Sequence, residues 1–207
     1  TQIYTLGPQG TFSDEATQKV LKTGVRVTYT GTFSEALGKV TEDVGSAAVV
    51  PVENSVAGTV AQVQDSLVRN DLIILGEINL LIEYSLLANA KLDQIEVCFA
   101  HPQALEQSSE FITNNLGKAQ NHFTRSNVDS GIRFLEAVDS GNKPVAAIVP
   151  ATFAQENSKW RKASAIQDYQ NNTTRFLVVR SRKSDEQLDY SRKKTSLLVE
   201  FMDDRSG

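Results

Sequence analysis

Residues 46–52 read Ser46-Ala47-Ala48-Val49-Val50-Pro51-Val52, a continuous run of small and apolar side chains. Such a run predicts a strand that is buried on both faces, as strands are in the parallel sheets of α/β proteins. A dense polar set follows at once, in the order Glu53-Asn54-Ser55-Val56-Ala57-Gly58-Thr59. In open α/β sheets ligands bind beyond the carboxyl ends of the strands, so this polar set is a candidate binding site. A turn between a strand and a helix uses the same residue types, and the stretch alone leaves both interpretations open.

Outward from this strand, short apolar strand patterns alternate with helical patterns. Strand patterns occur at residues 3–6, 25–29, 72–76, 80–87, 95–99, 145–149 and 175–179. Apolar residues recur at helical spacing within residues 12–20, 33–40, 60–67, 104–112 and 128–135. The alternation predicts an α/β fold with largely parallel strand pairing.

The last part of the chain has a different composition. Residues 182–194 are nearly all polar, which predicts a linker, and a new strand pattern follows at residues 195–201. One strand cannot bury its apolar face by itself. We therefore expect a second domain to begin at residue 195 and to be cut off at Gly207.

Composition limits the partners and the compartment. The chain has 207 residues, of which 40% are hydrophobic and 22% charged, and its net charge is −4. This is the composition of an ordinary globular protein, and its weak acidity argues against nucleic acid or an anionic membrane as the main partner. The sequence holds no apolar run close to the roughly 18 residues that span a membrane. Because Cys98 is the only cysteine and the chain opens directly on a strand pattern, we expect a cytoplasmic protein.

The common metal and cofactor signatures are missing from the sequence. His101 and His122 are the only histidines, and they lack the spacing of zinc ligands. A nucleophile elbow, a Walker loop and a dinucleotide fingerprint are likewise absent. We therefore expect neither a cofactor nor a metal.

Three further polar stretches adjoin predicted strands. They are Leu6-Gly7-Pro8-Gln9-Gly10-Thr11-Phe12-Ser13, Ala100-His101-Pro102-Gln103-Ala104-Leu105-Glu106-Gln107 and Asn171-Asn172-Thr173-Thr174-Arg175-Phe176. The first turns into a helix whose amides and hydroxyls could face an anion. In the second, Gln103 and Gln107 are four residues apart and share one helix face. Taken singly, each stretch is explained as well by a tight turn, a solvated helix face or a polar loop.

In combination and in this order, the stretches resemble the prephenate dehydratase family along residues 3–181. The matching stretches are Leu6-Gly7-Pro8-x-Gly10-Thr11-Phe12-Ser13, Val49-Val50-Pro51-Val52-Glu53-Asn54-Ser55-Val56-x-Gly58, His101-Pro102-Gln103-Ala104-Leu105-x-Gln107 and Thr174-Arg175-Phe176. Residues 194–197 and 203–207 look like the opening strand of the ACT regulatory domain that usually follows in this family. The chain departs from the family pattern at Ala100 and Ser108, where the family has Ser and Cys, and at residues 126–128, where it has Ser-Thr-Ala.

The resemblance implies a carbon–oxygen lyase that converts prephenate into phenylpyruvate, carbon dioxide and water in phenylalanine biosynthesis, without a cofactor. It assigns catalysis to Thr174, as a hydrogen-bond donor to the departing hydroxyl. The substrate-binding residues that it implies are Arg175, Asn54, Ser55, Glu53, Thr11, Gln103, Gln107 and Phe176. Alternation along a strand puts Thr174 and Arg175 on opposite faces, so Arg175 could instead form a structural ion pair.

The resemblance also implies an architecture and a regulation. The family fold is two α/β lobes, similar to periplasmic binding proteins, with the active site in the cleft between them. We expect a catalytic domain at residues 1–181, with lobe one at 1–80 plus 175–181 and lobe two at 81–174. A homodimer is expected, and phenylalanine should act only through the ACT domain. The nearest alternative is an arogenate dehydratase, and an alternative from another class is a solute-binding module without chemistry.

Overall fold

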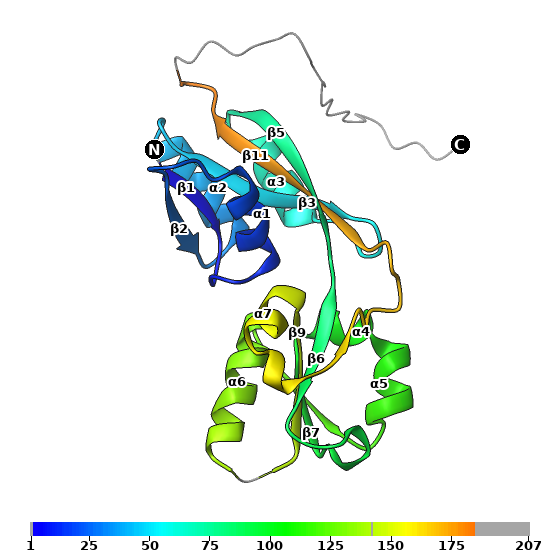
Figure 1. Cartoon of the computed structure of the whole chain (residues 1–207). Coiled ribbons are helices and arrows are strands. Elements are labelled where there is room, and N and C mark those ends of the chain that lie inside the picture. The colour runs from blue at the N-terminus through cyan, green and yellow to red at the C-terminus, as the bar shows by residue number, and fades with distance from the viewer. Residues whose placement is uncertain (1, 142, 185–207) are drawn as a thin grey trace, which may run out of the picture.

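The computed structural model describes residues 2–141 and 143–184. These residues form two lobes, each a β-sheet flanked by helices, and the lobes are stacked end to end (Figure 1). This is the α/β class that the sequence predicted. Residues 182 and 183 form a turn after the last strand. Residues 185–194 of the expected linker and the expected ACT strand lie outside the described residues.

The sheet of the first lobe has the strand order β2-β1-β3-β11-β5, and the short β4 pairs with β3. Its strands are β1 (Gln2–Leu6), β2 (Arg26–Thr30), β3 (Ala47–Asn54), β4 (Gly58–Thr59), β5 (Leu72–Leu81) and β11 (Thr173–Ser181). Its helices are α1 (Phe12–Val20), α2 (Phe33–Glu42) and α3 (Ala61–Arg69). β1 pairs in parallel with β2 and β3, whereas β11 is antiparallel to both β3 and β5.

β3, the strand that residues 46–52 predicted, is buried on both faces as expected. Val49 packs on one face, in a cluster that includes Ala16 of α1. Val50 packs on the other face, with Leu37 of α2 and Val63 of α3. Full burial of a side chain of this size stabilises a fold by about 1.5–3 kcal/mol. The two helical layers therefore fix the position of the polar residues that follow β3.

The sheet of the second lobe has the strand order β10-β6-β9-β7-β8. Its strands are β6 (Tyr84–Ala88), β7 (Val97–Ala100), β8 (Gln120–Phe123), β9 (Val145–Pro150) and β10 (Arg161–Ser164). Its helices are α4 (Pro102–Glu106), α5 (Ser109–Leu116), α6 (Asn127–Asp139) and α7 (Ala151–Glu156), with short 3-10 turns at η1 (Leu92–Gln94) and η2 (Ser158–Trp160). β7 is parallel to β8 and β9, and the antiparallel strands β6 and β10 are the two by which the chain enters and leaves this lobe.

The chain passes between the lobes twice, from β5 to β6 and from β10 to β11 (Figure 1). β5 continues to Leu81 and β11 begins at Thr173, so residues 81, 173 and 174 belong to strands of the first sheet. The sequence had placed these residues in the second lobe. The single strand expected at residues 80–87 is likewise divided, because the chain leaves one sheet for the other at Ile82 and Glu83.

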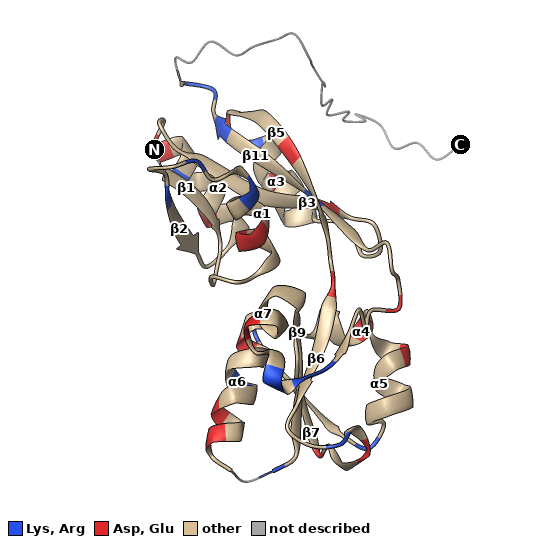
Figure 2. Cartoon of the chain, in the orientation of Figure 1, with Lys and Arg blue, Asp and Glu red and all other residues tan. Residues whose placement is uncertain are grey.

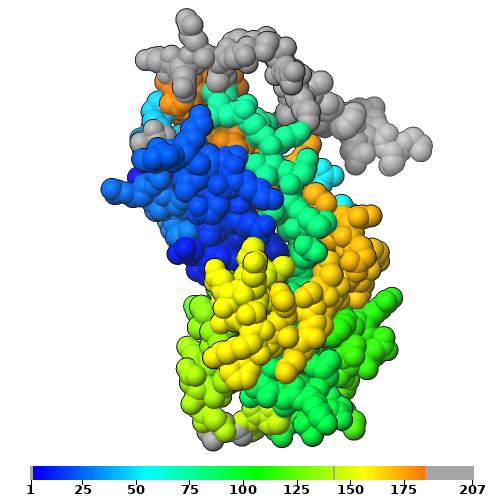
Figure 3. Space-filling view, in the orientation of Figure 1, coloured from blue at the N-terminus to red at the C-terminus, as the bar shows by residue number. Residues whose placement is uncertain are grey.

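The two lobes share one apolar core and touch beside it. Leu80, Ile82 and Leu86 are buried in the same cluster, which continues from β5 through the first crossing into β6. Next to it, Gly10 has a φ of +84°, and a Cβ added there would lie 3.4 Å from a methyl carbon of Val128 in α6. Figure 3 shows the first lobe, in blue, in contact with the segment around α7, in yellow.

Candidate active site

Thr174 and Asn54 lie opposite each other on the neighbouring strands β11 and β3. Both side chains are largely buried, at 8% and 7% exposure. The Asn54 Oδ1 atom accepts hydrogen bonds from the backbone N–H groups of Val56 (3.0 Å) and Ala57 (2.8 Å). Because a backbone N–H can only donate, these two bonds fix the orientation of the Asn54 amide. Its Nδ2 atom then donates to Thr174 Oγ1 at 2.8 Å.

The same Asn54 amide begins a chain of hydrogen bonds that leads into the second lobe. Asn54 Nδ2 also donates to Asn172 Oδ1 at 2.7 Å, and Asn172 Nδ2 donates to Gln107 Oε1 at 2.9 Å. The Tyr84 hydroxyl donates to the same Gln107 oxygen at 3.3 Å. Burial raises the pKa of Tyr84, and a hydrogen bond from the Asn127 side chain offsets only part of that rise, so the phenol is protonated and can donate at neutral pH.

This chain of bonds leaves two donor groups available to a ligand. The Thr174 oxygen accepts from Asn54, and the described part of the chain offers no acceptor for the Thr174 hydroxyl proton. Gln107 Nε2 likewise donates to no described residue, and it is not among the buried side-chain atoms that lack a partner. Gln107 is 5% exposed, so its nitrogen keeps a small exposed area and both of its N–H groups are available to donate. Both donors suit a ligand that carries oxygen anions.

Arg175 and Glu53 form an ion pair on the opposite face of the same strands. An Arg175 Nη2 to Glu53 Oε2 distance of 3.5 Å joins β11 to β3, and a distance of 3.9 Å from Arg175 Nη1 to Glu77 Oε2 joins β11 to β5. The Arg175 side chain is 44% exposed and that of Glu53 56%. Arg175 thus forms ion pairs in the structure, and these hold the Glu53 carboxylate on the face away from Thr174.

The remaining residues that the sequence assigned to the site have other neighbours. Ser55 Oγ accepts from the backbone N–H of Thr173 at 2.9 Å and so tightens the join between the two strands. Thr11 caps α1 and donates to the backbone oxygens of Leu6 and Pro8. Neither hydroxyl belongs to the chain of bonds between Asn54 and Tyr84.

Gln103 and Phe176 are also separate from that chain. Gln103 is exposed on α4, and its backbone N–H donates to Nδ1 of His101. Burial lowers the pKa of His101, so this nitrogen is an unprotonated acceptor. The Phe176 ring is 2% exposed and packs in the core shared by the two lobes. Of the residues that the sequence assigned to the site, Thr174, Asn54 and Gln107 thus belong to this chain of hydrogen bonds. The sequence did not assign Asn172 and Tyr84 to the site.

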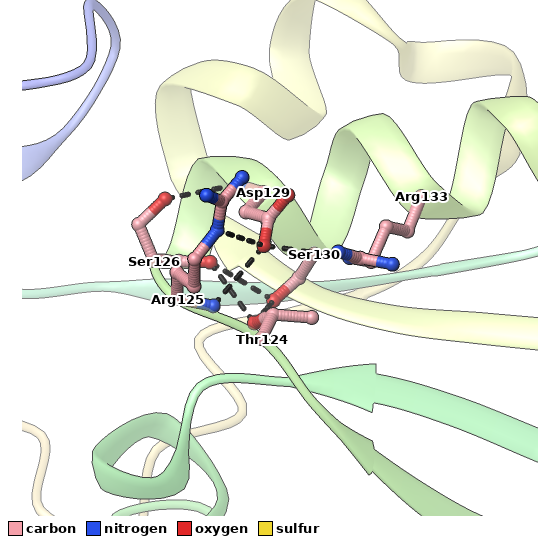
Figure 4. A network of polar contacts seen from close by, with 6 residues as sticks. All are labelled: Thr124, Arg125, Ser126, Asp129, Ser130 and Arg133. Atoms are coloured by element: carbon pink, nitrogen blue, oxygen red, sulfur yellow. Dashed lines mark hydrogen bonds and ion pairs between the residues drawn. The ribbon is translucent and has the colours of Figure 1, made fainter.

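The start of α6, where the family pattern was lost, is held by its own polar network (Figure 4). Ser126 caps the helix by accepting from the backbone N–H of Asp129, and Thr124 and Ser130 share a hydrogen bond of 2.7 Å. Burial raises the pKa of Asp129, but the backbone N–H of Arg125 and the guanidinium groups of Arg133 and Arg125 outweigh it and lower that pKa. These contacts are internal to the helix start.

A cavity of about 380 Å³ lies between α1 of the first lobe and α7 and β10 of the second. It is lined by Phe12, Glu15, Leu81, Glu83, Ser85, Ala151, Thr152, Gln155, Arg161, Ser164 and Ala165. Figure 2 shows acidic residues on α1 and at the crossing from β5 to β6. Burial raises the pKa of Glu15, Lys19 lowers it, and Glu83 raises it further.

The cavity adjoins the chain of hydrogen bonds, but its charge does not suit a dianion. The Tyr84 ring packs edge-on against Phe12, which lines the cavity, with 5.6 Å between the ring centroids. The lining holds two carboxylates, from Glu15 and Glu83, and one guanidinium, from Arg161. We therefore place the candidate site at Thr174 and Gln107.

The described residues hold neither a cluster of metal ligands nor a membrane-spanning helix. Within residues 2–141 and 143–184, no group of three or more His, Cys, Asp or Glu side chains is placed to hold a metal ion. In the same ranges, every helix is too short or too polar to cross a membrane.

The chain is similar to known proteins over most of its length. The family model described as prephenate dehydratase matches residues 3–184. The chain is 34% identical over 179 residues to the bifunctional chorismate mutase/prephenate dehydratase of Neisseria gonorrhoeae, which covers 86% of this chain and 49% of that protein. It is 30% identical over 210 residues to the prephenate dehydratase of Methanocaldococcus jannaschii, which covers 99% of this chain and 73% of that protein. The chain thus spans about half the length of the bifunctional relative.

Solved structures show the same fold. The prephenate dehydratase of Staphylococcus aureus subsp. aureus Mu50 has a TM-score of 0.72 at 28% identity, over 89% of this chain and 67% of that one. The prephenate dehydratase of Arthrobacter aurescens in complex with L-Phe has a TM-score of 0.75 at 28% identity, over 89% and 61%. A protein described as GqqA, a novel type of quorum quenching acylase, has a TM-score of 0.69 at 26% identity, over 89% and 65%.

Proposed function

Because this chain belongs to the prephenate dehydratase family, we propose that it converts prephenate into phenylpyruvate, carbon dioxide and water, and that Thr174 assists the loss of the hydroxyl group. One observation carries the assignment of Thr174. Its oxygen accepts a hydrogen bond from Asn54, so its own proton is directed away from that bond and is available to a ligand oxygen.

The reaction needs a donor at the leaving oxygen and no electron sink. The bond from the ring to the carboxylate breaks, its electron pair enters the ring, and the carbon–oxygen bond to the hydroxyl breaks as the ring becomes aromatic. The hydroxide takes up one proton, ultimately from solvent, and leaves as water. A hydrogen bond from Thr174 stabilises the negative charge that develops on that oxygen, and one preorganised donor of this kind is worth about 2.7–4 kcal/mol of the barrier.

Asn54 makes the threonine a better donor. Its Nδ2–H bond to Thr174 Oγ1 withdraws electron density from the hydroxyl, and chains of hydrogen bonds polarise one another in this way. The pair is held by the β3–β11 ladder, so its geometry exists before substrate arrives. The role of Thr174 is therefore that of a fixed donor and not of a free-standing acid.

Binding of the dianion falls to the neutral donors of the site. Gln107 offers two N–H groups to a carboxylate or to the side-chain keto group of the substrate. We propose that Arg175 acts through its ion pairs, by keeping Glu53 and Glu77 on the far face of the sheet, and that it does not hold the substrate. This arrangement keeps the Glu53 carboxylate from repelling prephenate.

The test is phenylpyruvate formation from prephenate by matched threonine variants. Thr174→Val keeps the shape and removes the hydroxyl, Thr174→Ser keeps the hydroxyl, and Thr173→Val removes a neighbouring hydroxyl that bonds only to the backbone oxygen of Asn171. We expect kcat to fall about 10²–10³-fold in Thr174→Val and to stay close to wild type in the other two. An unchanged kcat in Thr174→Val would overturn the assignment of Thr174.

The same assay separates the alternatives. Arogenate in place of prephenate tests for an arogenate dehydratase, and a measurable affinity for prephenate without turnover would indicate a solute-binding module. Acylase activity is measured alongside, because a protein of this fold is described as an acylase. Turnover of prephenate above that of the other substrates supports the proposed reaction.

We also propose that the protein is a cytoplasmic homodimer of phenylalanine biosynthesis. The dimer is supported by β5, an edge strand whose exposed side chains include Ile74, Leu75 and Leu81. Exposed apolar strand edges tend to pair with a second chain. Phenylalanine is proposed to act only through an ACT domain, so inhibition of this chain by phenylalanine through residues 2–184 would contradict that part. Light scattering of the purified protein tests the dimer.

A further inference from the structure

Asn172 occupies the second crossing between the lobes, directly before β11. It is 1% exposed. Its backbone oxygen accepts from the N–H of Ile82, in the first crossing, at 2.7 Å. Its side chain lies between Asn54 of the first lobe and Gln107 of the second, with hydrogen bonds of 2.7 and 2.9 Å. One amide thus joins the two halves of the proposed site.

The direction of every hydrogen bond from Asn54 to Gln107 follows from the bonds that Asn54 accepts from the backbone. The backbone N–H groups of Val56 and Ala57 require an oxygen of Asn54, so the Asn54 nitrogen must face Asn172. The Asn172 oxygen faces that nitrogen, which turns the Asn172 nitrogen toward Gln107. Gln107 must then present its oxygen to Asn172 and keep its nitrogen on the accessible side.

We propose that Asn172 is a positioning residue that determines which atom of Gln107 meets the substrate. Because Asn172 donates to Gln107 Oε1, the Gln107 N–H groups have no partner among the described residues and can bind an anionic oxygen. The Tyr84 hydroxyl supports the same orientation, since it donates to the same oxygen from β6. This inference rests on the proposed function only for the identity of the substrate, because the orientation of the Gln107 amide follows from contacts within the protein.

Asn172→Asp separates this role from a packing role. The carboxylate has the shape of the amide and still accepts from Asn54, so the contact between Asn54 and Thr174 is kept. It can no longer donate to Gln107. The Gln107 amide therefore reverses, donates its N–H groups to Asp at position 172, and presents an oxygen to the substrate. An oxygen there repels a carboxylate, so KM rises while kcat changes little.

The kinetic experiment compares four variants on prephenate. We expect KM to rise about tenfold or more in Asn172→Asp, the equivalent of one lost hydrogen bond to a charged group, with kcat within about threefold of wild type. Gln107→Glu places an oxygen at the same point and should give the same split. Tyr84→Phe removes one of the two donors to Gln107 and should raise KM less. Asn121→Asp, the same substitution on an exposed residue of β8, should leave both constants unchanged.

A second readout does not depend on turnover. The side-chain amide signal of Gln107, identified in an ¹⁵N spectrum by its loss in Gln107→Glu, should exchange rapidly with solvent in the wild type and be protected in Asn172→Asp. If wild type fails to turn over prephenate, the proposed function fails, and the spectrum still tests the orientation of the amide. Two outcomes would overturn the proposal. The first is an unaltered Gln107 signal in Asn172→Asp. The second is a loss of folding in Asn172→Asp that changes kcat and KM equally, together with an unchanged KM in Tyr84→Phe.

Discussion

Asn54→Asp is the substitution that most directly tests how the site is held. The new carboxylate keeps one oxygen where the amide oxygen was, so the bonds from the Val56 and Ala57 N–H groups survive and the turn after β3 is retained. Its second oxygen replaces Nδ2 at 2.8 Å from Thr174 Oγ1. A carboxylate oxygen accepts strongly, so the Thr174 hydroxyl turns and donates to it. The hydrogen bond that we propose Thr174 donates to the leaving group is thereby lost.

The expected size of the effect follows from these contacts. Loss of one preorganised donor to a developing oxyanion lowers kcat about 10²–10³-fold. The second oxygen also faces Asn172 Oδ1 at the 2.7 Å distance of the former hydrogen bond, so the Asn172 and Gln107 amides reverse. The reversed Gln107 nitrogen then faces the Tyr84 hydroxyl, which loses its acceptor. A buried polar group without a partner costs about 1–3 kcal/mol, so the free energy of unfolding should fall by that amount.

Steady-state kinetics on prephenate and urea unfolding measure the two effects, and a double mutant tests their cause. If Asn54 acts through Thr174, then Asn54→Asp in a Thr174→Val background should lower kcat by less than about threefold, because residues that act as a unit are not additive. Asn121→Asp serves as the charge control, since Asn121 is exposed on β8. Independent, multiplying effects of the two substitutions, or a wild-type kcat in Asn54→Asp, would refute the polarised donor.

Three further outcomes follow from other contacts. Gly131→Val should lower the free energy of unfolding by at least about 1–3 kcal/mol in urea, because a Cβ at Gly131 would lie 2.2 Å from Phe153 Cε1; a wild-type value would show that α6 and α7 can separate freely. Arg175→Gln should change the free energy of unfolding by less than about 1 kcal/mol, since the ion pairs are partly exposed. It should leave the KM for prephenate unchanged, and a large rise in KM would show that Arg175 binds a carboxylate of the substrate. The lowered pKa of Asp129 adds stability that is complete above its ordinary range near pH 4 and is lost as pH falls through the folded value, so Asp129→Asn should flatten the acid limb of a stability–pH curve.

The parts of the fold that the sequence predicted are those with a strong local pattern. The continuous run at β3 predicted burial on both faces, and Val49 and Val50 do pack on opposite sides of the sheet. The stretch Thr32-Phe33-Ser34-Glu35 has the pattern of a capping box, and at the start of α2 Thr32 Oγ1 accepts from the backbone N–H of Glu35. These signals involve residues within a few positions of one another, so they can be interpreted without knowledge of the rest of the chain.

Elements that depend on distant residues were predicted wrongly or missed. One helix was expected across residues 104–112, but the structure has two, α4 and α5, because Asp168 caps the second. Its carboxylate accepts from the backbone N–H groups of Ser109 and Glu110, and its own backbone N–H donates to the backbone oxygen of Gln107. β8 was missed because all four of its side chains are exposed and carry no alternating pattern. The contacts that decide both cases join residues far apart in the chain.

The candidate site shows the same limit in its chemistry. The sequence could name Thr174, Asn54 and Gln107 because each lies in a polar stretch beside a strand, and motif order was enough to select them. It could not show how they are hydrogen-bonded to one another. The direction of these hydrogen bonds is set by backbone N–H groups after β3, and the bond from Asn54 to Asn172 joins residues that are 118 positions apart. Asn172 stood in the quoted stretch as one amide among several polar residues. Only the crossing of the chain between two sheets gives it a partner in each lobe, and that topology is what turns a polar loop residue into the link between the donor and the binding group.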